Sequence, residues 1–483
     1  MRWAAAVVAA VGVTVAAGQL MPHTLTATAL PQNTAGQVQQ VTTVCPGVYR
    51  TPDTAEAVTA ISLDPAPVGS GEIVASDADP LPLPTGGVGT RTLPATAGAS
   101  VRVTAGADSV ATTATVREYV DPADEGRGLA LSGCVAPRSE WWFTGTSAVQ
   151  GRIDTVLLTN PTSAPAVVLV EVFGPAGRLD LVGTSGVVVQ PNASAEIRVD
   201  SLAPGTSNAT VHLMTTAGLV SAALRSTSID GLIPLGSEYL PASDAPAVKQ
   251  VVPGVLAGAG ERTLILTAPT GDAAAHVRVV TASGIEDLEG QSQVPIPAGH
   301  TVVVDLAPTL LGRAGAVVVS SSSPVTAAVS STVEGTLAPD ATGVLSRRPV
   351  ADVAFSAAQA PIASQWRLPL SGVAAAPGVV GLSVVGGPAS VTLEVRAANG
   401  ATWQQQVDIA ADTAMDISVP VTADSASIVT VNKTGGAGEL HAAVSQSGSL
   451  PDGPVVAQAV GFDPSIVVEI PFAYPDPQVL GRP

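Results

Sequence analysis

The sequence contains few aromatic and few charged residues. Aromatic residues make up 3% and charged residues 12% of the 483 positions, and this charged share is about half the usual quarter. The charges that do occur are mostly acidic, because 39 Asp and Glu face 21 Lys and Arg, for a net charge of -18. No basic cluster interrupts this pattern, so the sequence predicts no nucleic-acid partner.

Recognisable catalytic and metal-binding motifs are also missing. The five histidines lie too far apart in the sequence for a zinc-binding helix, and no G-x-S-x-G nucleophile motif occurs. The glycine-rich stretch at residues 254–263 precedes a strand pattern, whereas a phosphate cradle needs the start of a helix. We therefore predict no enzyme activity, no cofactor and no metal. The acidic segments at 76–80 and 121–126 lack EF-hand spacing and are interpreted as solvated loops, with calcium binding left open.

Only two cysteines are present, Cys45 and Cys134. In an exported protein they allow a single intramolecular disulfide, and a loop of about 90 residues would be stabilised by roughly 4 kcal/mol. Two buried free thiols are the alternative.

The N-terminal stretch "MRWAAAVVAAVGVTVAAGQL" places Arg2 before a run of small apolar residues from Trp3 to Ala17. This order is typical of a secretory signal, and about 15 apolar residues is short for a spanning helix. We predict a signal peptide or an uncleaved signal anchor within residues 1–29. The protein is then extracellular or in the cell envelope, and it meets a membrane only through this segment.

Apolar residues nevertheless make up 46% of the chain, and they alternate with polar residues in short runs such as "AEIRVD" at 195–200. This period of two is typical of half-buried strands, and turn signals recur about every 8 to 12 residues. The 48 glycines and 40 prolines supply those turns. The sequence predicts an all-β fold.

Internal repeats indicate how the strands are grouped. Residues 155–179 match residues 263–287 in pattern, and a weaker copy begins near 381. Units of about 100 residues have the size of an immunoglobulin-like β-sandwich. We predict tandem sandwich repeats, packed together or as beads on a string. The expected segments are an N-terminal β domain at 41–136, repeats at 139–245, 250–346 and 351–449, and a Pro-rich tail at 450–483.

Adjacent tryptophans occur once, in "SEWWFTG". Along a strand, Trp141 and Phe143 point to one face and Trp142 to the other, so both faces are apolar. One interpretation is a plug between two domains, with both faces buried. The other is a contact for a partner or a glycan, in which Trp141, Trp142, Phe143 and Trp366 stack on sugar rings.

The stretch "WWFTG…DTVLLTNPTSAPAVVLVEVFGPAG", preceded by "CPG" and "SGCVAP" and by the signal segment, resembles a family of secreted or membrane-anchored actinobacterial proteins of unknown function. The resemblance implies export and a cell-envelope setting, and it supplies no catalytic residues. We expect a non-enzymatic structural or binding scaffold whose partner is an envelope component or a protein. A glycan-binding module is the first alternative, and an envelope enzyme with dispersed acidic residues is the second.

Overall fold

The computed structural model describes most of residues 127–460, together with the backbone of shorter strands between residues 34 and 120 and at 467–470. Within 127–460 the gaps are 134, 182–185, 232, 291–292, 336–349, 371–377, 398, 421–426 and 451–452. The predicted signal segment at 1–29, Cys134 and the acidic segments at 76–80 and 121–126 lie outside the described residues. Strands β1 (Thr34–Gln37) and β35 (Val467–Ile470) pair in a unit of their own.

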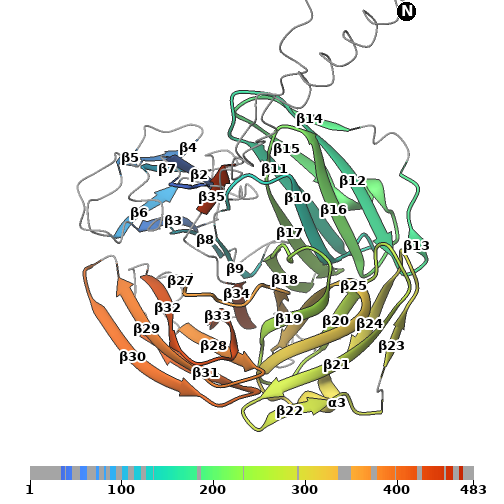
Figure 1. The fold of residues 1–483 in the computed structure, drawn as a ribbon. Coiled ribbons are helices and arrows are strands. Elements are labelled where there is room, and N and C mark those ends of the chain that lie inside the picture. The colour runs from blue at the N-terminus through green and yellow to red at the C-terminus, as the bar shows by residue number, and fades with distance from the viewer. Residues whose placement is uncertain are drawn as a thin grey trace, which may run out of the picture. The chain divides into compact units, whose positions relative to one another are not determined.

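The remaining strands form four copies of one arrangement, each with two antiparallel sheets (Figure 1). In the first copy the sheet orders are β2-β7-β4-β5 and β6-β3-β8-β9. The bounds are β2 (Gln40–Cys45), β3 (Ala55–Ile61), β4 (Glu72–Ala75), β5 (Leu81–Pro82), β6 (Val88–Leu93), β7 (Val101–Gly106), β8 (Ala114–Val120) and β9 (Leu129–Gly133).

The second copy repeats this order as β10-β16-β12-β13, with β14 also on β12, and β15-β11-β17-β18. A short helix, α2 (Val199–Leu202), follows β15. The bounds are β10 (Glu140–Thr146), β11 (Arg152–Asn160), β12 (Ala166–Gly174), β13 (Gly177–Arg178), β14 (Val187–Val189), β15 (Ala193–Arg198), β16 (Ala209–Ala217), β17 (Ser221–Asp230) and β18 (Ile233–Leu240).

In the third copy one strand, β25, belongs to both sheets. Its first half pairs with β19 and β21, and its second half pairs with β20 and β26, so the two sheets are continuous. The bounds are β19 (Ala247–Val255), β20 (Arg262–Thr267), β21 (Ala273–Thr281), β22 (Gly284–Asp287), β23 (Val294–Ile296), β24 (Thr301–Asp305), α3 (Ala307–Leu310), β25 (Gly315–Glu334) and β26 (Ala351–Ala357).

The fourth copy has the orders β27-β32-β29-β30 and β31-β28-β33-β34. The bounds are β27 (Gln365–Leu370), β28 (Gly378–Val385), β29 (Ala389–Ala397), β30 (Thr402–Ile409), β31 (Thr413–Val419), β32 (Ser427–Gly435), β33 (Glu439–Leu450) and β34 (Gly453–Val460).

This architecture confirms the predicted all-β class and its sandwich-like repeats. Two of the copies end later in the sequence than the predicted segments do. Strand β26, placed by the sequence in the repeat at 351–449, pairs with β25 of the third copy. Strand β34, placed in the tail at 450–483, pairs with β33. Periodicity alone does not show which neighbouring strand β26 or β34 joins.

The alternation of residue types explains how each sandwich closes. Along β12, Ala166, Val168, Val170 and Val172 are buried, while the residues between them are only partly buried. The buried set packs with apolar residues of the opposite sheet, such as Val156 and Leu224, in one core. Because the period is two, one face of each strand enters the core and the other face is left for a second contact.

That second contact joins neighbouring copies. Between the second and third copies, Thr144 Oγ1 donates to Thr326 Oγ1 at 2.8 Å, and Thr210 and Thr267 share a hydrogen bond of 2.7 Å. Between the third and fourth copies, one cluster of buried residues combines β19, β21 and β25 with β28 and β31. The described copies are therefore packed against one another, which excludes freely jointed beads for this part of the chain.

The contact between the third and fourth copies predicts a difference between two positions on β19. Val251 is 3% exposed within that cluster, whereas Val248 on the same strand is 53% exposed. We expect Val251→Asp to lower the free energy of unfolding by about 3 kcal/mol or more, because an unpaired charge would be buried. Val248→Asp is the matched control and should change it by less than about 0.5 kcal/mol. Calorimetry of both variants checks this, and equal shifts would contradict the packed arrangement.

Candidate functional site

The last strands of the four copies meet at a pair of buried carboxyl groups. Strands β9, β18, β26 and β34 contact one another in sequence and close on themselves, since β34 also contacts β9. Figure 1 shows β9, β18 and β34 side by side. Glu238 on β18, Asp352 on β26 and Arg127 just before β9 are each 0% exposed. We call these three side chains the carboxylate junction.

Asp352 accepts four backbone hydrogen bonds. Its Oδ1 accepts from the N–H of Val353 at 2.9 Å and of Ser237 at 3.3 Å. Its Oδ2 accepts from the N–H of Val456 at 2.8 Å and of Leu129 at 3.3 Å. The donors belong to β26, β18, β34 and β9, so one carboxyl group contacts a strand from every copy.

Glu238 contacts three of the same strands. Its Oε1 accepts from the N–H of Tyr239 at 2.7 Å and of Leu131 at 3.1 Å, and its Oε2 accepts from the N–H of Gln458 at 2.8 Å. Each of these strands is the last in its own sheet, where backbone N–H groups have no neighbouring strand to bond. A buried N–H without a partner is costly, so the two carboxyl groups replace a missing ladder.

Two glycines allow the strands of the carboxylate junction to approach one another closely enough for these hydrogen bonds. A Cβ added to Gly236 would lie 2.5 Å from Asp352 Oδ1, and one added to Gly128 would lie 2.5 Å from the Ser237 carbonyl oxygen. Gly236 also has a φ of 118°, in the region that favours glycine. Arg127 completes the site by donating from Nη1 to the carbonyl oxygen of Pro454 at 2.9 Å.

Apolar side chains of two of these strands pack in the core of a copy other than the one to which their strand is hydrogen-bonded. Val353 and Phe355 of β26, which is hydrogen-bonded to the third copy, pack in the core of the second copy. Leu129 and Leu131 of β9 pack in the core of the fourth copy. The junction thus joins the copies both by hydrogen bonds and by apolar burial.

Burial determines the ionisation of the two acids. It raises the pKa of Asp352 to about 8, while the backbone donors and Arg127 act in the opposite direction. Burial also raises the pKa of Glu238 well above its ordinary value, against hydrogen bonds from Gln458, Tyr239 and Leu131. Elsewhere in the fourth copy, burial lowers the pKa of His441 to about 4.

The aromatic stretch is in the interior. Trp141, Trp142 and Phe143 are 2%, 5% and 1% exposed. Trp141 and Phe143 belong to the core of the second copy. Trp142, on the opposite face, stacks on His212 with ring centroids 3.7 Å apart, and its backbone oxygen accepts from the Ser243 N–H at 2.8 Å.

Trp366 is also buried, at 5% exposure, in the core of the fourth copy. Stacking on a sugar needs an exposed ring face, and none of these four side chains has one. The interpretation of Trp141, Trp142, Phe143 and Trp366 as a glycan platform is therefore wrong. The sandwich cores cover Trp141, Phe143 and Trp366, and His212 with the segment at Ser243 covers Trp142.

A cluster of polar side chains covers the buried ring of Trp142. His212 contacts Glu171 through Nδ1 at 2.9 Å and Glu140 through Nε2 at 3.0 Å, and Glu140 also accepts from Trp142 Nε1. Glu171 in turn pairs with Arg178. His212 is thus a strand histidine whose two ring nitrogens are both satisfied, consistent with a structural position.

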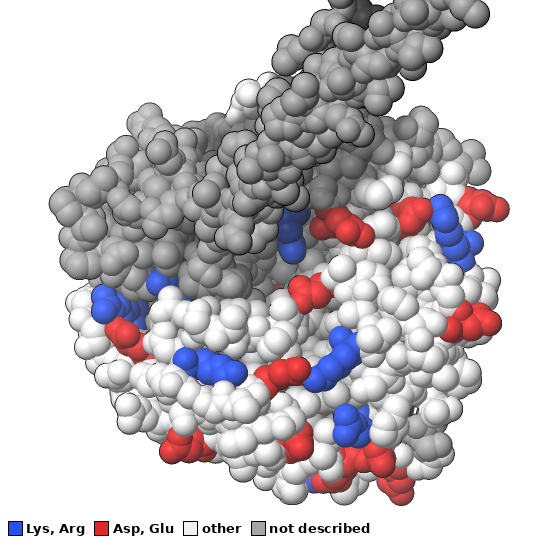
Figure 2. Space-filling view, viewed as in Figure 1, with Lys and Arg blue, Asp and Glu red and all other residues white. Residues whose placement is uncertain are grey.

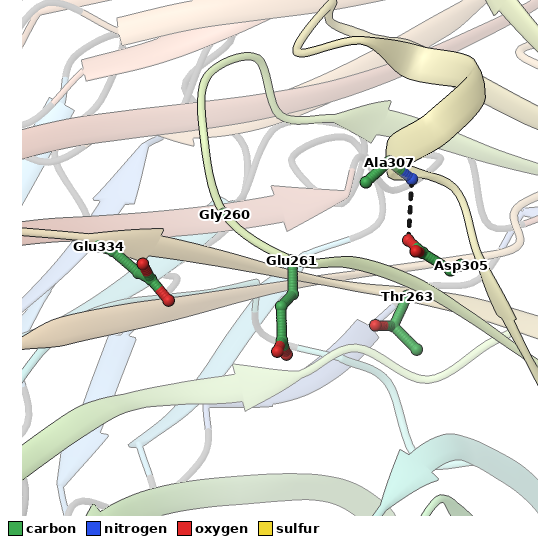
Figure 3. Close-up of a pocket in the computed structure, with 6 residues that line it drawn as sticks. All are labelled: Gly260, Glu261, Thr263, Asp305, Ala307 and Glu334. Atoms are coloured by element: carbon green, nitrogen blue, oxygen red, sulfur yellow. Dashed lines mark hydrogen bonds between the residues drawn. The ribbon is translucent and has the colours of Figure 1, made fainter. Parts of the chain in front are cut away.

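One surface pocket is lined by carboxyl groups, with a volume of about 390 Å³. Its residues are Gly260, Glu261, Thr263, Asp305, Ala307 and Glu334 (Figure 3). Asp305 turns toward the backbone N–H of Ala307, from which it accepts at 2.9 Å, whereas Glu261 extends away from that contact (Figure 3). Two acids that act on a single bond must face a common point. The acids of this pocket do not face one.

The charged side chains form no large patch of one sign on the face that Figure 2 shows, where acidic and basic residues are scattered among uncharged ones. Among the residues described, no group of three His, Cys, Asp or Glu side chains is placed to hold a metal ion. No helix within the described part of the chain has the length and apolar character needed to span a membrane.

The junction predicts the effect of removing one carboxylate oxygen. In Asp352→Asn, an amide NH₂ would face backbone N–H donors that require an acceptor. We expect the free energy of unfolding to fall by about 1 to 3 kcal/mol, because buried backbone donors lose an acceptor. Asp287→Asn, at an exposed pair with His276, is the control and should cost at most about 1 kcal/mol. Denaturant titration of both variants measures the difference.

Asp352→Asn should also change how the stability of the protein depends on pH. Because the pKa of Asp352 is about 8 in the folded chain against an ordinary 3.8, the folded state binds more protons between these values, and stability falls as pH rises through them. Buried His441 acts in the opposite direction below pH 6.5. Between about pH 6.5 and 8 the stability should therefore decrease with pH, and Asp352→Asn should flatten that slope. An unchanged slope would show that Asp352 does not titrate there.

Comparisons with known proteins give a family but no activity. A search of curated proteins finds no match. A crystal structure titled as a tetra-tandem repeat in the extending region of a large adhesion protein matches at 12% identity, covering 89% of this chain and 98% of that one. Its TM-score is 0.10, so it carries no argument. A family model matches residues 90–420, and on that basis the chain belongs to the family of unknown function DUF5719.

Proposed function

We propose that this protein is a non-enzymatic, exported component of the cell envelope that holds several β-sandwiches as one rigid scaffold. The carboxylate junction is the observation that carries the proposal. Sandwich repeats joined only by linkers move relative to one another. Here, moving one copy away would take a strand from Asp352 or Glu238 and leave a buried donor or acceptor without a partner.

A rigid scaffold suits a structural or binding role better than catalysis. Glu238 and Asp352, the two acids whose pKa values burial raises most clearly, are 0% exposed and surrounded by backbone donors, so no substrate reaches them. The acids of the surface pocket point in different directions (Figure 3). These features favour the scaffold over the enzyme alternative. The partner of the scaffold is an envelope component or another protein.

The order of residues at the N-terminus supports export, and one backbone contact supports the proposed disulfide. The segment at residues 1–29 has the order of a signal peptide or signal anchor. Val44, next to Cys45, exchanges two backbone hydrogen bonds of 2.9 Å with Val135, next to Cys134. Positions beside such an antiparallel pair are close enough for a disulfide. We propose that Cys45 and Cys134 form that disulfide in an oxidising compartment.

Hydrogen exchange tests the rigid scaffold. If the junction locks the four copies together, the amides of Leu129, Leu131, Val456 and Gln458 exchange only on global unfolding. We expect them to be as slow as amides of the sandwich cores, such as Val170. Asp352→Asn should accelerate Leu129 and Val456 while Val170 keeps its protection in the folded state. Rapid exchange at all four junction amides in the native chain would refute the scaffold.

Mass spectrometry tests export. The native protein is taken from culture medium, membrane and cytosol, and its intact mass and non-reducing peptides are measured. We expect either a shortened N-terminus in the medium or an intact Met1 in the membrane fraction, and a peptide joining Cys45 to Cys134 in both cases. A full-length chain with two free thiols in the cytosol would refute export while leaving the scaffold intact.

A further inference from the structure

One outer strand differs from its counterparts in the other copies. In this position the second copy has the fragments β13 and β14, the third has β22 and β23, and the first has the two-residue β5. The fourth copy has the single strand β30, whose eight residues pair with β29 without a bulge. Among the described residues β29 is its only pairing partner, and β30 lies at the outer edge of its sheet (Figure 1). Short or broken edge strands prevent edge-to-edge pairing, and β30 lacks this protection.

The composition of β30 adds no other protection. Its sequence "TWQQQVDI" contains no Pro, Gly, Lys or Arg, and Asp408 is its only charged residue. Inward-facing Trp403 and Val407 pack against the core of the fourth copy, which fixes the strand in place. The side chains of Gln404, Gln405 and Gln406 are exposed.

The adjoining turn shows which backbone groups of β30 point outward. The N–H of Ala397 donates to the carbonyl oxygen of Ala401, so these two residues form a hydrogen-bonded position. Such positions alternate along an antiparallel ladder. Trp403, Gln405 and Val407 therefore bond to β29. The outward N–H and C=O groups belong to the four residues between and beside them, Thr402, Gln404, Gln406 and Asp408.

We propose that β30 pairs antiparallel with β30 of a second copy of this chain, about a twofold axis at Gln405. Only this register matches all four outward residues, with Thr402 opposite Asp408 and Gln404 opposite Gln406. It places no like charges opposite each other, whereas a parallel pair would oppose two Asp408 carboxylates. On the other face, Trp403 lies opposite Val407 of the second copy.

Charge repulsion between two copies is weak at this edge. The chain has a net charge of -18, so two copies repel one another over most approaches. Strand β30 contributes one charge in eight residues, and that charge meets a threonine in the proposed register. Strand addition of this length is a small contact, so the dimer is weak and is populated at high concentration.

Cysteine cross-linking tests the register. At the twofold axis, the two copies of residue 405 form a pair that is not hydrogen-bonded across the new interface, with Cα atoms about 4.5 Å apart, which suits a disulfide. We expect Gln405→Cys to form a covalent dimer under mild oxidation, several-fold more than Gln404→Cys, because residue 404 faces residue 406. The wild-type chain is the control for its own two cysteines. Peptide mapping must show a 405–405 link.

Sedimentation of the full-length chain tests the edge itself. The mass should rise from 47.8 kDa toward twice that value as concentration increases. Gln404→Pro removes one outward N–H and should leave a monomer with an unchanged melting temperature, while Gln404→Thr should dimerise like the wild type. A monomer at every concentration, or a Gln405→Cys link to a segment other than β30, would overturn the proposal.

Discussion

The four copies depend on a few hydrogen bonds from backbone N–H groups to Asp352 and Glu238. A sheet ends where its last strand has no neighbour, and here four such ends lie together. Their donors need acceptors, but the strands do not pair with one another as a ladder. Two carboxyl groups supply seven acceptor contacts instead. The cost is the burial of two acids, which their raised pKa values record.

The all-β class and the repeat pattern could be predicted because both depend on local alternation. Residues 195–200 and their counterparts show which face is buried without any knowledge of the partner strand. The assignment of β26 could not be predicted, because its pairing with β25 is decided by packing with distant residues. The same limit applies to Trp142, whose cover comes from His212 and the segment at Ser243.

The junction was missed although a signal for it is present. Glu238 in "GSEYL" and Asp352 in "ADVAF" are acids inside apolar strand patterns, where one acidic residue normally marks the wet face. Burial in this case depends on distant donors: Leu129 lies 223 positions from Asp352, and Gln458 lies 220 positions from Glu238. An acid that interrupts the corresponding strand of two repeats is the pattern that points to such a site.

The position of β34 in the sequence has a consequence for the order in which the molecule folds. It ends at Val460, near the end of the chain, and it donates to acids that lie 104 and 220 positions earlier. Until β34 has arrived, Asp352 and Glu238 each lack one of their backbone donors. The sandwiches can form one by one as the chain emerges, but their mutual locking waits for β34. In the export proposed above, the copies would reach their locked arrangement only after the chain has crossed the membrane.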